Sequence, residues 1–174
     1  MTQRRILIVD DQEEVRSALA KVLERDGYRV IHAENAEEGE RILQEQTVHL
    51  VISDHHMPGT TGIEFLKATG ERHPDVVRMM MSGDPDNRVV IRSIREGRVF
   101  WFLRKPWDNT VLRVVVCLAF QRRELEEQNR QLVTALGRQL EFLQELEAEF
   151  PELRARARGE AQALRAAQGS TGSR

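Results

Sequence analysis

The stretch of sequence that decides the fold is VISDHHMPGTTGIEFL, residues 51–66. Its apolar start is rich in β-branched residues and too short for a helix, so we expect a buried strand over Val48–Ser53. A polar loop from Asp54 to Thr61 follows, and an amphipathic helix begins near Gly62. A strand that leads through a loop into a helix is the unit from which parallel sheets are built.

The same unit recurs on both sides of this stretch. Four more short apolar runs predict strands at Ile6–Val9, Tyr28–Ala33, Val76–Met81 and Val99–Leu103. Helical patterns separate them, including one with Val90, Ile91 and Ile94 on its apolar side. Five strands joined by helices imply right-handed crossovers and a doubly wound α/β domain with a five-stranded parallel sheet.

Polar side chains follow four of the five strands. Asp10 and Asp11 come after the first strand, Asp54 after the third, Ser82 after the fourth and Lys105 after the fifth. Because the carboxyl ends of parallel strands share one edge of the sheet, these groups are expected to lie together. Three carboxylates suit a hard cation such as Mg²⁺. A carboxylate can also form an aspartyl-phosphate, with a lysine and a hydroxyl stabilising the phosphoryl oxygens.

The sequence resembles the receiver domain of two-component response regulators from residue 4 to about residue 120. The motifs that carry the resemblance are ILIVDD at 6–11, the stretch at 51–66, MMMSGD at 79–84 and WFLRKPW at 101–107. The ending KPWD is similar to receivers of regulators linked to HD-type cyclic-di-GMP phosphodiesterases. The resemblance implies a flavodoxin-like sheet of strand order 2-1-3-4-5.

The resemblance also implies a role for each site residue. Asp54 is the expected phosphoacceptor. Mg²⁺ is expected among Asp10, Asp11, Asp54 and the backbone carbonyl of His56. Ser82, Lys105 and Phe102 are the expected switch and phosphoryl-contacting residues, with a cis peptide at Pro106. The implied partner is a sensor histidine kinase or a phosphotransfer protein.

From Asp108 a helix can run without a break signal to Phe150, where Pro151 stops it. Its apolar residues follow a heptad pattern, which predicts a helix that pairs with a second copy. Arg122, Asn129 and Gln139 interrupt this seam, and Asn129 is expected to fix its register. The predicted seam comprises Val111, Val115, Leu118, Leu125, Asn129, Leu132, Leu136, Leu143, Leu146 and Phe150. We therefore expect a receiver domain at 1–120, a coiled-coil dimerisation helix at 121–150 and a flexible tail at 151–174.

Composition and net charge argue against a nucleic-acid-binding, membrane-spanning or disulfide-bonded protein. The 174 residues carry a net charge of −2, so no overall field attracts nucleic acid, and no direct nucleic-acid binding is expected. No apolar run approaches the roughly 20 residues of a membrane span, and nothing resembles a signal peptide, so a cytoplasmic protein is expected. Cys117 is the single cysteine, which excludes an internal disulfide.

Two other functions compete with signal reception. A phosphatase that uses an aspartyl-phosphate typically needs a second acidic residue two positions after the nucleophile, where this chain has His56. A phosphorylation-independent dimeric scaffold would not need the acidic set. We therefore expect a receiver that catalyses only its own phosphorylation and dephosphorylation. The heptad helix also has a simpler interpretation, a solvated linker to an effector.

Overall fold

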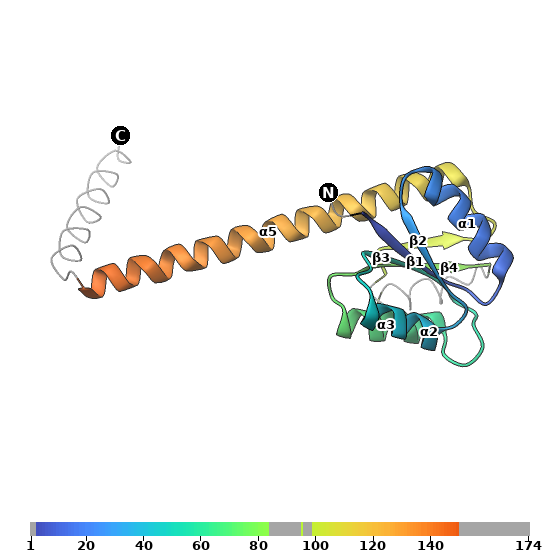
Figure 1. Cartoon of the computed structure of the whole chain (residues 1–174), viewed down its shortest axis with the longest axis horizontal. Helices are drawn as coiled ribbons and strands as arrows, with labels where there is room; N and C mark the ends of the chain where they lie inside the picture. Colours follow the sequence, from blue (N-terminus) through green and yellow to red (C-terminus); the bar gives the residue numbers. More distant parts are fainter. Residues whose placement is uncertain (1–2, 84–94, 96–98, 150–174) are drawn as a thin grey trace, which may run out of the picture. The chain divides into compact units, whose positions relative to one another are not determined.

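The computed structural model describes residues 3–83, 95 and 99–149. Two compact units divide the chain, residues 1–125 and residues 126–174. The first unit contains every strand found in the described residues, and the helix α5 begins in it and continues into the second (Figure 1). The elements are β1 (Arg5–Val9), α1 (Glu13–Arg25), β2 (Arg29–Ala33), α2 (Ala36–Glu45), β3 (Leu50–Asp54), α3 (Gly62–Arg72), β4 (Val77–Ser82), β5 (Trp101–Arg104) and α5 (Asn109–Glu149).

The five strands form one parallel sheet of order β2-β1-β3-β4-β5, which confirms the predicted topology. The central strands β1 and β3 are almost entirely buried, as their continuous apolar runs predict for strands covered on both faces. The predicted helix that contains Val90, Ile91 and Ile94 lies outside the described residues.

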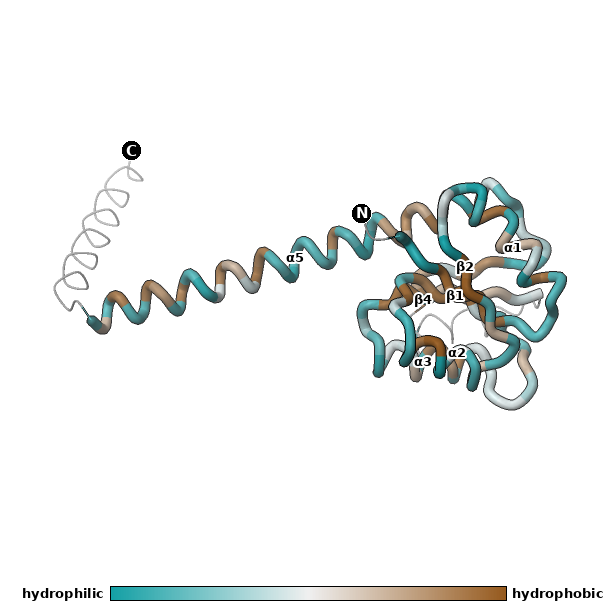
Figure 2. The backbone as a smooth tube through the Cα atoms, in the orientation of Figure 1, coloured by the Kyte–Doolittle hydropathy of each residue, from teal (hydrophilic) through white to brown (hydrophobic). Residues whose placement is uncertain are grey.

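Helices cover both faces of the sheet, with α1 and the start of α5 on one face and α2 and α3 on the other (Figure 1). Alternate residues of each strand point to opposite faces. On β1, Ile6 and Ile8 belong to the core cluster beneath α1 and α5, whereas Leu7 and Val9 belong to the cluster beneath α2 and α3. The hydropathy colouring shows the same concentration of apolar residues along the sheet (Figure 2).

Tyr28 does not begin the second strand as expected. Gly27 ends the turn after α1 with a φ of 85°, a left-handed conformation that favours glycine. The Tyr28 ring then stacks on Phe120 of α5, with ring centroids 5.1 Å apart. Tyr28 therefore joins the sheet to the terminal helix, and β2 begins one residue later.

The helix α5 begins at Asn109 and ends, in the described residues, at Glu149. Asp108 caps it, because its carboxylate accepts hydrogen bonds from the backbone N–H groups of Thr110 and Val111. These hydrogen bonds lower the pKa of Asp108. No helix in the described part of the chain is long and apolar enough to cross a membrane.

Candidate phosphoacceptor site

The polar groups predicted at the strand ends come together at one edge of the sheet. The Lys105 ammonium lies 2.7 Å from Asp10 Oδ2 and 2.6 Å from Asp54 Oδ1. Asp10 is fully buried and Asp54 is 5% exposed. A single cation therefore bridges two buried carboxylates that belong to β-strand ends 44 positions apart in sequence (54 − 10).

The backbone fixes the second oxygen of each carboxylate. Gln12 N–H donates to Asp10 Oδ1 at 2.9 Å, and His56 N–H donates to Asp54 Oδ2 at 2.8 Å. Each carboxylate is thus held at both oxygens, which leaves little rotational freedom. Such preorganisation is what a site needs when it acts by positioning and electrostatics.

The pKa values of Asp10 and Lys105 are set by two opposing effects, burial of the charged groups and hydrogen bonding between opposite charges. Burial is the largest effect on Asp10 and raises its pKa, although the hydrogen bonds from Lys105 and Gln12 oppose it. Burial also favours the neutral amine of Lys105, but the hydrogen bonds to Asp10 and Asp54 and the charges of both carboxylates outweigh it and raise the Lys105 pKa. Lys105 is therefore a cation at neutral pH.

The remaining predicted residues lie on β4 and β5 or directly after β1 and β5. Ser82 ends β4 and is fully buried, and its carbonyl accepts from Lys105 N–H at 2.9 Å. The Lys105–Pro106 peptide bond is cis. Phe102 on β5 is half-buried and packs against the core cluster beneath α2 and α3. Asp11 is exposed and lines a hollow of about 410 Å³ beside Asn35 and Gly59.

The oxygen donors fit Mg²⁺. The described residues hold no ready-made group of three or more His, Cys, Asp or Glu side chains around a metal position. Mg²⁺ keeps several waters and is commonly bound through one or two carboxylates, so such a group is not required. Asp10, Asp54 and the exposed Asp11 carry hard oxygen donors after two neighbouring strands, and Lys105 balances the charge of the first two in this structure.

Two residues that support the site were not singled out from the sequence. Arg16 of α1 donates through Nη1 to the backbone carbonyl of Asp10 at 2.5 Å, which ties the acidic loop to the helix. At Gly62, a Cβ atom would lie 2.0 Å from the Asp54 carbonyl oxygen. Only glycine therefore lets α3 begin so close to Asp54. The sequence signal for Gly62 was its place at the start of a helix that follows a loop.

Within the first unit, the prediction that Val115 belongs to the dimer seam is wrong. Val115 is only 3% exposed and lies in the core cluster beneath α5, so it packs inside its own domain and is not available to a second copy. The guanidinium of Arg122 lies 5.4 Å from the centre of the Phe100 ring. Val111 and Leu118 remain 45% exposed on the same helix.

The comparisons with known proteins agree on one family. A family model for the response regulator receiver domain matches residues 6–116. The hydrogenase transcriptional regulatory protein HoxA of Cupriavidus necator is 36% identical over 105 residues, which cover 60% of this chain and 22% of that protein. The chain therefore corresponds to less than a quarter of that relative's length.

Solved structures extend this similarity to the fold. The signal receiver domain of an HD domain-containing protein from Pseudomonas fluorescens Pf-5 superposes with a TM-score of 0.71 at 30% identity, covering 74% of this chain and 94% of that one. The beryllofluoride-activated NtrC4 receiver domain dimer superposes with a TM-score of 0.65 at 28% identity, covering 68% and 98%. The sheet order, the acidic pair beside Lys105 and the match over residues 6–116 lead to one conclusion: this chain belongs to the response regulator receiver family.

Proposed function

We propose that Asp54 accepts a phosphoryl group from the phosphohistidine of a sensor histidine kinase or of a phosphotransfer protein. The observation that carries this proposal is the buried Asp54 carboxylate, held at one oxygen by Lys105 and at the other by the His56 N–H. An Asp54 oxygen attacks phosphorus, an O–P bond forms, the P–N bond breaks, and its electron pair returns to the imidazole of the donor.

The chain's own residues would stabilise this transfer by charge. Lys105 already contacts Asp54 and would follow the phosphoryl oxygens once the carboxylate has become an acyl phosphate. Mg²⁺, held by Asp10, Asp11, Asp54 and the His56 carbonyl, would neutralise phosphoryl oxygens that Lys105 does not reach. The buried hydroxyl of Ser82, at the end of the neighbouring strand, would donate to one of them.

The same chemistry supplies a switch. Phosphorylation replaces one carboxylate charge with about two negative charges at pH 7, so Lys105 and Ser82 are drawn toward Asp54. Phe102 is half-buried on β5 and would turn inward as Ser82 moves. The affected edge strand precedes α5 directly, so we propose that phosphorylation changes how α5 pairs with a second copy or how this face binds a partner.

Two experiments test these steps separately. Borohydride reduction after incubation with Mg²⁺ and a small-molecule phosphodonor, followed by peptide mapping, should locate the acyl phosphate at Asp54 and nowhere else. Trapping at another residue would refute the assignment. Small-angle scattering and sedimentation, with Asp54→Asn as the matched control, test the switch. Unchanged scattering and unchanged dimer affinity in fully phosphorylated protein would leave reception intact and refute the switching step.

A further inference from the structure

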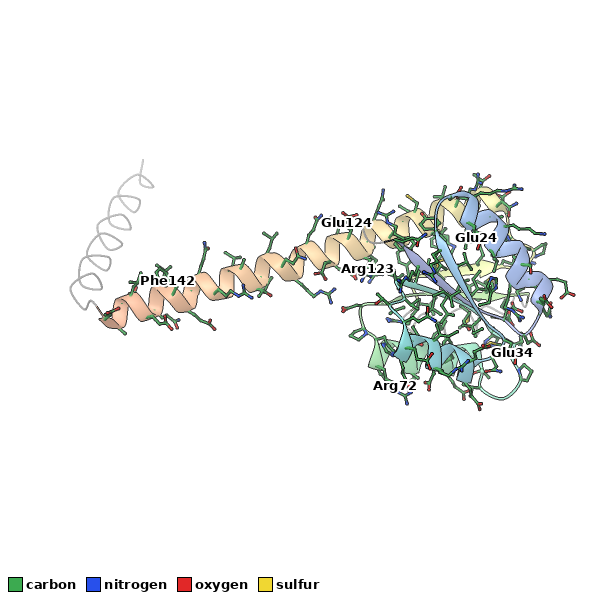
Figure 3. The ribbon with its side chains drawn as sticks, in the orientation of Figure 1. Glu24, Glu34, Arg72, Arg123, Glu124 and Phe142 are labelled. Carbon is green, nitrogen blue, oxygen red and sulfur yellow. The ribbon has the colours of Figure 1, made fainter. Side chains whose placement is uncertain are left out.

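The part of α5 in the second unit, Glu126–Glu149, exposes much apolar surface. Six large side chains there are each more than half exposed: Leu132, Val133, Leu136, Leu140, Phe142 and Leu143. Figure 3 shows the Phe142 side chain projecting from this helix. Together they offer on the order of 600 Å² of apolar surface, whereas a stable interface buries about 800 Å² per partner. An exposed apolar surface of this size is often functional.

Two amides interrupt the leucine seam and identify what covers it. In the heptad, Asn129 shares its position with Leu136 and Leu143, and Gln139 shares its position with Leu132 and Leu146. An amide buried against leucine has no hydrogen-bond partner, and that state is costly. An amide buried against an identical amide is satisfied, because each group carries both donors and an acceptor.

Two arrangements of two copies pair both amides, and only one of them also keeps every leucine of Glu126–Glu149 in the seam. When the helices run parallel and in register, Asn129 faces Asn129 and Gln139 faces Gln139 of the second copy. When they run antiparallel, positions of the first kind face positions of the second kind. If Asn129 faces Gln139, both amides are paired, but Leu146 then falls opposite the charged Arg122, outside Glu126–Glu149. If Asn129 faces Leu146, Gln139 falls opposite Leu136 and neither amide is paired. The parallel arrangement also buries every leucine of the seam against its own counterpart.

The residues beside the seam are compatible with the parallel arrangement. Across a parallel pair, Ala135 approaches Leu140 of the second copy, and Gln128 approaches Val133. Neither contact brings like charges together. The ion pair between Arg130 and Glu127, 2.7 Å long, lies within one helix and does not depend on a partner.

We propose that the seam of Glu126–Glu149 is occupied by the same segment of a second copy, parallel and in register, with Asn129 and Gln139 as its two amide layers. This inference rests on the dimer proposed above and adds its orientation and register. It also predicts that replacing both amides by leucine tightens the pair and removes its preference for one orientation.

Disulfide trapping tests the orientation directly. In a Cys117→Ser background, Leu132→Cys and Leu146→Cys are oxidised in a glutathione buffer, each alone and as an equal mixture. A parallel pair predicts cross-linked dimers in each single sample. Position 146 distinguishes the orientations, because in the two antiparallel registers its like cysteines would be 17 positions (146 − 129) or 24 positions (146 − 122) apart. That is roughly 25 Å or more, beyond disulfide reach. Glu141→Cys, on the opposite face of the helix, is the control and should stay uncross-linked.

The possible outcomes distinguish the orientation of the pair, the existence of the dimer and the receiver role. Cross-linking in the mixture alone, or of Leu132→Cys but not of Leu146→Cys, would overturn the parallel arrangement and keep the dimer. No cross-linking, together with a monomer in sedimentation of the unmodified chain, would overturn both the inference and the dimer of the proposed function. Neither result would change phosphorylation of Asp54 in the same samples, which tests the receiver role by itself. In the Asn129→Leu, Gln139→Leu background, cross-links should appear in the single samples and, in addition, between unlike cysteines in the mixture.

Discussion

Replacing Lys105 with methionine tests the electrostatics of the site. Methionine keeps most of the side-chain volume and removes the charge that bridges Asp10 and Asp54 at 2.7 and 2.6 Å. Removing one member of a buried ion pair costs about 3–5 kcal/mol because the partner charge is left uncompensated. The Lys105 side chain is 19% exposed, so we expect a value near the lower limit, about 3 kcal/mol at pH 7.5 without Mg²⁺.

The loss should depend on pH in a definite direction. Burial raises the pKa of Asp10 in the folded protein, and the ammonium of Lys105 opposes that rise. Without Lys105 the folded protein holds a proton at this carboxyl more tightly than the unfolded chain does. Stability of the variant therefore falls as pH rises through the folded pKa, and the difference from wild type is larger at pH 8 than at pH 5.

Urea unfolding measures this difference, with Lys67→Met as the matched control. Lys67 is exposed on α3, so the same chemical change should alter the free energy of unfolding by less than about 0.5 kcal/mol. Lys105→Met should lower the midpoint by about 1–2 M urea. Adding Asp10→Asn should recover part of the loss. If Lys105→Met matched the Lys67→Met control at every pH, the argument that Lys105 neutralises buried charge would be refuted.

Two further substitutions examine the packing around the site. Gly62→Ala should destabilise the protein by about 3 kcal/mol or more, because the added Cβ would lie 2.0 Å from the Asp54 carbonyl oxygen. Gly83→Ala is the control, since a Cβ at Gly83 would have no atom within 4 Å. It should change the free energy of unfolding by less than about 1 kcal/mol in the same urea assay. Equal effects would contradict the close approach. Burial, followed by the charges of Arg123 and Arg5, lowers the pKa of His49, so its contribution to stability is present above about pH 6.5 and is lost as pH falls toward the folded pKa. His49→Asn can still accept the Arg5 N–H bond and should flatten the fall in stability between pH 7 and 5; an unchanged slope would exclude His49 as its source.

The sequence predicted the sheet well because each strand is a short β-branched run and the order of polar residues after the strands is regular. Asp10, Asp54, Ser82 and Lys105 could be placed at one edge from topology alone. The bridging position of Lys105 could not be predicted, since it depends on which side-chain rotamer satisfies two buried carboxylates. The contact from Arg16 to the Asp10 carbonyl could not be predicted either, because it also depends on a side-chain rotamer.

For the terminal helix α5, the sequence pattern alone could not distinguish a dimer seam from a stripe that faces the core. A repeat of 3.5 residues and one of 3.6 residues differ by little over two turns, so Val115 fits both a seam and a core-facing stripe. In the structure Val115 is buried in the core of its own domain, so it belongs to the core-facing stripe. Farther along α5, Leu132 and Leu136 are more than half exposed, so burial does not contradict the heptad prediction there.

The central claim is that Asp54 carries the phosphoryl group, and intact mass spectrometry tests it most directly. Wild-type protein and Asp54→Asn are incubated with Mg²⁺ and a small-molecule phosphodonor, and a parallel wild-type sample receives a chelator. We expect the mass of one phosphoryl group, about 80 Da, to be added to the wild type with Mg²⁺ and to neither of the other samples. A wild type that gains nothing, or an Asp54→Asn variant that gains as much, would contradict the account.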